Sequence, residues 1–311
     1  MDRISDILVI VNPLAGDQPA IAKAAALARW LGSGIELLIC DTRMLRKAYT
    51  EGNLPAASNA LPTDDLESLL EQMAEPLRDD GIDVTTHVIS GNPLHAVVTS
   101  WMRNSPADLV VKDTHHHSLV ERTFAANTDW HLIRACPLPL LLTKPKPWGT
   151  PPLMMAAVDP GHANDRAALL EHRILDVTAS IARQIDARLH AVHAYVPTAL
   201  AKAAAVRMPP GVGRSAGALA AERELRRSQV KQLTDQFAVP DANLHVYAGM
   251  ATEYLPRMAA EWHADIVVMG AISRSPSKST LIGSTAERVL ESLPCDALVV
   301  KLPDFAQNLP F

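Results

Sequence analysis

Short apolar runs alternate with longer amphipathic stretches along the whole 311-residue chain. Runs of Ile, Val and Leu without interspersed polar positions are typical of strands buried on both faces of a parallel sheet. The stretches between them, such as Pro19–Leu31 and Asp64–Asp79, are rich in helix-forming residues. The predicted strands are Ile7–Val11, Ile35–Ile39, Val84–Ile89, Leu109–Val111 and Leu138–Leu142, then Leu153–Val158, Arg188–Ala194, Asn243–Tyr247, Ile266–Met269 and Ala297–Val300. This alternation predicts an α/β fold of doubly wound, parallel sheets.

The alternation of predicted strands and helices occurs twice along the chain with similar spacing, which indicates a tandem duplication. His87, Gly91 and Ala107-Asp108 match His245, Gly249 and Ala264-Asp265 in spacing, with one residue of slippage. The proline-rich segment Lys144–Pro152 separates the copies, because it can neither continue a helix nor pair as an inner strand. We therefore expect two domains, residues 1–146 and 153–304, each with a five-stranded sheet.

Composition narrows the class of protein. The net charge is −5, all of it from residues 1–150, so neither half carries the basic field that nucleic-acid binding needs. No apolar stretch approaches the roughly 18 residues needed to span a bilayer. Cys40, Cys136 and Cys295 lie far apart without CxxC spacing, which favours a reduced, cytoplasmic protein over a disulfide or zinc-ribbon framework.

The loop after the predicted strand Ile266–Met269 contains the parts of a phosphate site. Gly270 follows the strand and permits a tight turn or a close ligand. Gly283-Ser284 opens a helix whose first amide groups attract phosphate, and Arg274 and Lys278 add positive charge. A structural alternative explains the same residues, since "STAE" (Ser284–Glu287) is also a capping box and the glycines are common turn residues.

These features together resemble the universal stress protein family, and within it the members that carry two domains in one chain. The residues that carry the resemblance are "VDP" after the first strand of the second half, "ADIVVMG", "GSTAERVLESLPCDALVVK" and, in the first half, "TDWHLIRACPLPLLLTKPKPW". The resemblance implies a HUP-type fold, similar to the adenine nucleotide alpha hydrolases. It also implies an intramolecular pseudo-dimer whose domains pack through their last strands, with a homodimer as a further assembly.

The resemblance also implies an adenine nucleotide site in the second half. Family members that bind ATP share a loop G-x2-G-x9-G-[S/T/N], and Gly270, Gly283 and Ser284 match it, whereas Ser273 replaces the middle glycine. ATP or AMP, with Mg²⁺ as a companion ion, is the expected ligand. The implied contact residues are Asp159 and Ala194 near the base, Met269 and Gly270 at the end of the fourth strand, and Ser273, Gly283, Ser284 and Thr285 in the loop and helix.

The first half has lost this loop. An offset of 157 residues places Asp113, His116 and Ala126 where the loop residues should stand, and Asn12 replaces the strand-one aspartate. A scaffold role or a different pocket is expected there. "THHHS" invites a zinc site at His115 and His117, with Asp113 and His131 nearby, but adjacent histidines on a loop seldom reach one ion, so solvated polarity is the alternative.

The sequence therefore predicts a cytoplasmic stress-response protein that binds adenine nucleotide in its C-terminal domain. Walker A, GxSxG and HExxH motifs are absent, so at most slow ATP hydrolysis is expected. One alternative is a binding protein for an apolar ligand, a metal or a protein partner, with a vestigial loop. The segment Thr198–Arg227 is expected to form either a helix-loop-helix flap over the site, which would also suit an apolar ligand, or a plain surface insertion.

Overall fold

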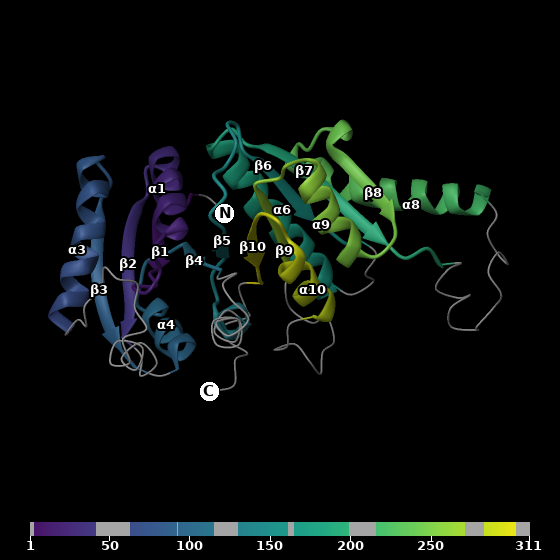
Figure 1. The fold of residues 1–311 in the computed structure, drawn as a ribbon. Coiled ribbons are helices and arrows are strands. Elements are labelled where there is room, and N and C mark those ends of the chain that lie inside the picture. The colour runs from purple at the N-terminus through teal and green to yellow at the C-terminus, as the bar shows by residue number, and fades with distance from the viewer. Residues whose placement is uncertain are drawn as a thin grey trace. The chain divides into compact units, whose positions relative to one another are not determined.

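The computed structural model describes residues 3–41, 63–91, 93–114, 130–160, 165–198, 216–270 and 283–302. The chain divides into two compact units, and the boundary lies between Pro147 and Trp148. Each unit is an α/β layer structure built on a parallel sheet (Figure 1).

The N-terminal unit has its five strands in the order β3-β2-β1-β4-β5, and every neighbouring pair is parallel. Helix α1 packs on β1 and β4, α3 on β3, and α4 on β2. The elements are β1 (Asp6–Ile10), α1 (Pro19–Leu31), β2 (Gly34–Asp41), α3 (Thr63–Asp79), β3 (Val84–Ser90), α4 (Leu94–Met102), β4 (Leu109–Asp113) and β5 (Leu140–Thr143).

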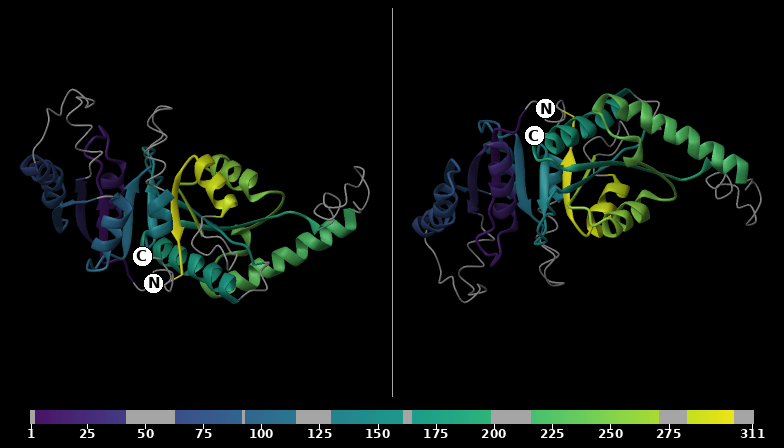
Figure 2. Two further views of the ribbon diagram at one scale, coloured as in Figure 1. Left: turned by 90° about the horizontal axis from the view of Figure 1, so that it is seen from below. Right: turned by 90° about the horizontal axis from the view of Figure 1, so that it is seen from above.

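The C-terminal unit repeats this order as β8-β7-β6-β9-β10. Helices α6 and α8 cover one face of its sheet, and α9 and α10 cover the other (Figure 2). The elements are β6 (Leu153–Ala157), α6 (Asp165–Gln184), β7 (Arg188–Tyr195), α8 (Ala216–Thr234), η1 (Asp235–Phe237), η2 (Asp241–Asn243), β8 (Leu244–Ala248), α9 (Ala251–Glu261), β9 (Ile266–Gly270), α10 (Ser284–Ser292) and β10 (Asp296–Val300).

The predicted α/β class with two parallel sheets is confirmed. Each predicted strand begins and ends within two residues of the observed one, and the helix Pro19–Leu31 has the predicted bounds. Proline at its first position and the left-handed Gly32 after its last explain that accuracy, because these residues mark helix ends. The expected packing of the domains through their last strands stays a prediction.

The repeated Ala-Asp pair has the same structural task in both units. Asp108 accepts hydrogen bonds from the backbone amides of Ser5 and Asp6, at 2.7 and 3.4 Å. Asp265 accepts them from Gly149 and Leu153, at 3.1 and 2.8 Å. In each unit the aspartate fixes where the first strand begins beside the fourth, and hydrogen bonds to a carboxylate are the stronger kind.

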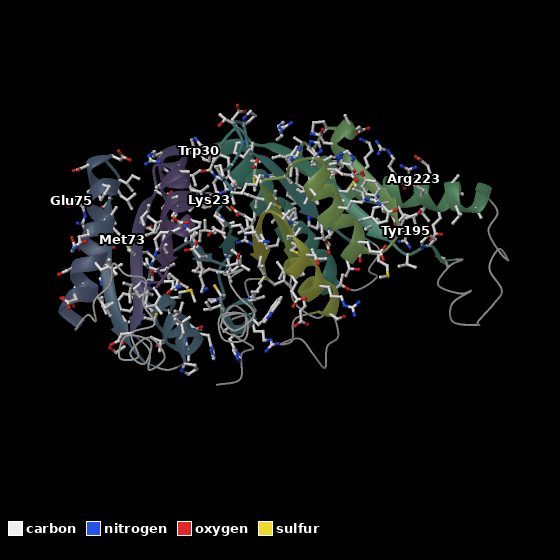
Figure 3. The ribbon with its side chains drawn as sticks, viewed as in Figure 1. Lys23, Trp30, Met73, Glu75, Tyr195 and Arg223 are labelled. Atoms are coloured by element: carbon white, nitrogen blue, oxygen red, sulfur yellow. The ribbon has the colours of Figure 1, made fainter. Side chains whose placement is uncertain are left out.

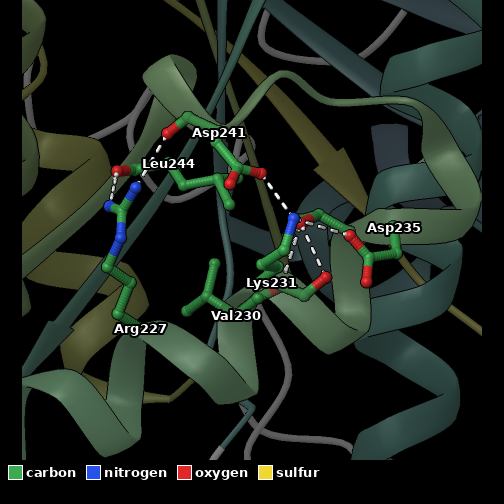
Figure 4. A network of polar contacts seen from close by, with 7 residues as sticks. Arg227, Val230, Lys231, Asp235, Asp241 and Leu244 are labelled. Carbon is green, nitrogen blue, oxygen red and sulfur yellow. Dashed lines mark hydrogen bonds and ion pairs between the residues drawn. The ribbon is translucent and has the colours of Figure 1, made fainter.

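Helix α8 is fastened to the start of the edge strand β8 (Figure 4). Arg227 donates to the carbonyl oxygens of Leu244 and Asp241, at 2.8 and 3.0 Å. One turn later, Lys231 Nζ lies 2.5 Å from Asp241 Oδ1 and 3.2 Å from Asp235 Oδ1. Because one side chain reaches two backbone carbonyls, this end of α8 has a defined position relative to the sheet.

A histidine pair joins β7 to β8. His190 Nδ1 lies 3.0 Å from His245 Nε2 with the rings almost parallel, and the Trp262 ring centroid lies 4.4 Å from that of His245. In the N-terminal unit the position of His190 is held by Glu36, and His87 Nε2 lies 3.7 Å from Glu36 Oε1. Burial, then the positive charge of His190 and Arg227, lowers the pKa of His245 to about 4, and burial lowers the pKa of His190.

The histidine pair predicts an acid-sensitive C-terminal unit. Between pH 7 and 5, His245 becomes protonated in the unfolded chain near its ordinary pKa, whereas in the folded chain it stays neutral until about pH 4. The free energy of unfolding therefore decreases as the pH is lowered from 7 to 5. His190→Glu copies Glu36 of the other unit and favours the imidazolium form. Urea midpoints at pH 7 and pH 5 should show a smaller acid loss for this variant than for wild type. Equal losses would contradict the assignment to this pair.

Candidate functional site

The carboxyl ends of β6, β7 and β9 open into a cavity of about 340 Å³. It lies where the strand order reverses, between α6 on one face of the sheet and α9 and α10 on the other, which is the usual ligand position in such sheets. Seven candidate nucleotide residues line this cavity: Asp159, Ala194, Met269, Gly270, Gly283, Ser284 and Thr285. The eighth, Ser273, lies outside the described residues.

The first turn of α10 forms one wall of the cavity, and its N-cap is Gly283 rather than Ser284. The Glu287 amide donates to the Gly283 carbonyl at 3.0 Å, which closes the first helical turn. The cap has no side-chain hydrogen bond. The capping-box interpretation, with Ser284 capping and Glu287 reaching back, is therefore wrong, because the helix begins at Ser284, one residue earlier than that motif requires. Ser284 and Thr285 instead present the first two amides of α10 beside the cavity.

Gly270 is needed for packing rather than for a turn. Its φ lies outside the left-handed region, so the freedom of glycine to adopt a positive φ is not used at this position. A Cβ at this position would lie 2.8 Å from Leu170 Cδ2, a side chain of α6 that also lines the cavity. Glycine at the end of β9 lets α6 approach the edge of the sheet closely, and this makes the cavity narrower.

Polar groups gather where β6 and β7 end. The Asp159 amide donates to Glu171 Oε2 at 2.9 Å, and Glu171 is a buried carboxylate of α6. His193 Nδ1 lies 3.0 Å from the Val158 carbonyl and 3.8 Å from Asp159 Oδ1. Because a carbonyl only accepts, Nδ1 carries the hydrogen. These contacts hold the backbone at Asp159, whose side chain remains about one-third exposed.

Sequence reasoning missed Glu171 and His193. Both interrupt apolar surroundings, Glu171 between Leu170 and Ile174, and His193 inside the strand "AVHAYV". A charged or polar residue on the buried face of an element is unusual and is the signal that would have found them. Leu255 of α9, which lines the opposite wall, carries no such signal, because an apolar residue on an amphipathic helix is ordinary.

The N-terminal unit uses the corresponding place for its own carboxylate. Asp113, the counterpart of Gly270, is buried and accepts from the Ala20 amide at 2.5 Å and from Thr143 Oγ1 at 2.8 Å. Ala20 lies in the first turn of α1, so the carboxylate occupies that helix N-terminus. Asn12, the counterpart of Asp159, accepts from the Leu14 amide at 3.1 Å and forms a turn.

The expected zinc residues His115 and His117 lie outside the described residues. Of their suggested companions, Asp113 binds Ala20 and Thr143, and His131 stacks on His95 with ring centroids 4.5 Å apart. Within the described ranges, no group of three or more His, Cys, Asp or Glu side chains is arranged to hold a metal ion. The zinc site stays a prediction.

Comparison with known proteins shows to which family the chain is similar. It matches the model of the Universal stress protein family over residues 4–144 and 154–301. It is 28% identical to Universal stress protein E of Escherichia coli (strain K12) over 315 residues, or 99% of this chain and 97% of the relative. The corresponding protein of Salmonella typhi is 27% identical over 314 residues, again 99% and 97% of the two chains.

Solved structures of other proteins have a similar fold. A protein of unknown function from Pseudomonas aeruginosa matches with a TM-score of 0.73 at 25% identity, over 98% of this chain and 95% of that one. A universal stress protein from Archaeoglobus fulgidus shares the fold, with a TM-score of 0.64 at 12% identity over 96% and 97% of the chains. The chain belongs to the universal stress protein family and carries the family's domain twice. Along its whole length it is similar to Universal stress protein E.

Two further findings concern the rest of the chain. All three cysteines are buried and free. Among the described helices, none combines the length and apolar character that crossing a bilayer requires.

The place of Asp113 yields a stability prediction. Asp113→Ala should lower the free energy of unfolding by about 1–3 kcal/mol, because the Thr143 hydroxyl and the first turn of α1 lose a buried acceptor. Asp113→Asn keeps an acceptor of the same size and should lose less. Urea unfolding checks both variants. An Ala variant as stable as wild type would show that the carboxylate does not hold α1.

The helix start at Ser284 yields a second prediction. Ser284→Ala should change stability by less than about 0.5 kcal/mol, since the residue is exposed and lies after the cap. Loss of a true N-cap serine costs about 1 kcal/mol. Urea unfolding without ligand distinguishes the two cases. A loss of that size, shared non-additively with Glu287→Ala, would restore the capping box.

Proposed function

We propose that this chain is a cytoplasmic stress-response protein that binds adenine nucleotide, ATP or AMP, in the cavity of its C-terminal unit. The observation that carries the proposal is the convergence of distant candidate residues on one cavity. Asp159 follows β6, Ala194 and Met269 lie at the ends of β7 and β9, and Gly283, Ser284 and Thr285 lie at the start of α10. The universal stress protein resemblance implies a nucleotide for this set.

The chemistry of the lining suits the two ends of a nucleotide. Ala194, Met269 and Leu255 provide apolar surface against which a purine can lie, and the partly exposed Asp159 carboxylate can accept from an amine or a ribose hydroxyl. The first amides of α10 have no partner inside the helix and lie at its positive end, which favours phosphate. We place the base at the strand ends and the phosphates at α10, with Mg²⁺ as a companion of the phosphates.

In the N-terminal unit, Asp113 occupies the position that corresponds to Gly270. This supports a role for the N-terminal unit that does not depend on a ligand. A buried carboxylate on the N-terminus of α1 already provides the negative charge that a phosphate would bring. It also repels a phosphate from the same position. We propose that this unit is a scaffold and that nucleotide binds to the C-terminal unit alone.

Two isosteric substitutions at Gly283 test the proposed site. Gly283 has φ −69° and ψ 137°, which any residue adopts, and Asp and Asn are both better N-cap residues than Gly. Both variants should therefore fold, but only Gly283→Asp places a negative charge where the phosphates lie. Calorimetric titration with ATP and Mg²⁺ should show binding to wild type and Gly283→Asn, and at least about tenfold weaker binding to Gly283→Asp.

Two results would count against the site. Absence of binding heat with wild type, together with a melting temperature unchanged by excess ATP, would exclude nucleotide as the ligand of this unit. Equal affinities of the Asp and Asn variants would place any bound phosphate away from α10.

A further inference from the structure

A second cavity of about 620 Å³ continues from the first along the carboxyl edge of the sheet. Asp159, Ala194, Ala251, Ser284 and Thr285 line both cavities, so the two share a wall. The second cavity extends past the ends of β7 and β8 towards α8 and is the larger of the two. A nucleotide with its phosphates at Ser284 and Thr285 would therefore have its terminal phosphate at the entrance to this second space.

The second cavity is positively charged. Arg226 from α8 and Arg288 from α10 line it, against the single carboxylate of Asp159. Arg226 donates to the amide oxygen of Gln229 at 3.3 Å. No ion pair joins either arginine to a carboxylate among the residues that the structure describes. Glu222, one turn earlier on α8, lies close enough for Arg226 to lower its pKa, so Arg226 shares its charge between this carboxylate and an anionic ligand. A guanidinium is suited to phosphate.

Tyr195 provides an independent indication of a polar ligand. Its side chain is 7% exposed and lines the second cavity, and its hydroxyl has no hydrogen-bond partner in the described part of the chain. The buried Nε of Arg226 is in the same situation, and the Arg226 guanidinium carbon lies 5.6 Å from the Tyr195 ring centroid. Buried donors without partners are rare and costly, so two in one cavity point to a ligand rich in acceptors.

Part of the remaining wall is apolar. Val196 and Met250 are among the large hydrophobic residues that are exposed, at 50% and 44%, and both line this cavity. Figure 3 labels Tyr195, which is on this wall, and Arg223 of α8. Apolar walls do not contribute to the binding of a phosphate group. Aromatic and guanidinium planes beside such walls suit a flat base.

We propose that the ligand of the C-terminal unit is a dinucleotide, in which phosphates join adenosine to a second nucleoside. The first cavity holds the adenosine, the start of α10 holds phosphates at the shared wall, and Arg226, Arg288, Tyr195 and Met250 receive the rest of the linker and the second base. This inference rests on the proposed nucleotide function and names the class of nucleotide. The fastening of α8 through Arg227 and Lys231 gives Arg226 a defined position (Figure 4).

Calorimetric titration of the full chain with ATP, diadenosine tetraphosphate and NAD⁺ at one ionic strength tests the proposal. Diadenosine tetraphosphate carries about the same charge as ATP, so simple charge attraction is matched. At least one of the two dinucleotides should bind about tenfold tighter than ATP, because a stacked base and new hydrogen bonds are added. NAD⁺, with two linking phosphates, shows whether a short linker suffices.

Three variants locate the effect. Arg226→Ala should remove the advantage of the dinucleotide over ATP, because it weakens binding of the dinucleotide much more than binding of ATP. Arg223→Ala removes the same charge from the same helix, one turn earlier and outside the cavity lining, and should keep the advantage. Tyr195→Phe deletes only the hydroxyl, should not lower the melting temperature, and should weaken the dinucleotide about threefold.

The outcomes separate the two proposals. ATP binding without any dinucleotide advantage overturns the dinucleotide and leaves the nucleotide site. If Arg223→Ala and Arg226→Ala lose the affinity advantage of the dinucleotide equally, the dinucleotide proposal is also overturned. The advantage would then come from the overall positive charge of α8 and not from a contact with Arg226. If neither ATP nor a dinucleotide binds, both proposals fail.

Discussion

The C-terminal unit depends on one constraint, the reversal of strand order between β6 and β9. Parallel strands place all their carboxyl ends on one edge, and at a reversal the connecting helices leave to opposite faces of the sheet. A crevice between α6 and α10, the helices that follow β6 and β9, results from this topology before any side chain is specified. Asp265 secures the constraint, since its carboxylate binds the backbone where β6 begins and thereby fixes the register of the two strands. The position of the site is thus a property of the fold, and the side chains decide only what it accepts.

The sequence predicted the elements well for identifiable reasons. Buried parallel strands read as unbroken apolar runs, and α1 is marked at both ends by Pro19 and Gly32. The start of a helix at Gly283-Ser284 was visible in the loop sequence itself. The candidate residues at strand ends, Asp159, Ala194 and Met269, and Thr285 in the helix came from the family resemblance.

Other features could not be read from the sequence, because they depend on contacts between distant residues. A one-residue difference in the start of α10 decides whether Ser284 is a cap or a cavity residue, and helix boundaries are not predicted to that precision. The reason for glycine at position 270 is the approach of Leu170, which is a hundred positions earlier in the chain. The sequence placed Asp113 where a loop glycine should stand, and only its bonds to Ala20 and Thr143 show that it is a structural acceptor. The second cavity combines α8, the β8–α9 turn and α10, which no local motif connects.

The replacement of Gly270 by Asp113 in the first copy also bears on how the whole chain responds to its ligand. A protein assembled from two identical single domains would offer two equal sites, and their occupation could be cooperative. Here one copy has its acceptor built into the chain, so on the proposed function a single site titrates. The degree of saturation then follows a simple hyperbola, and the chain reports nucleotide concentration over a broad, graded range rather than as a sharp threshold.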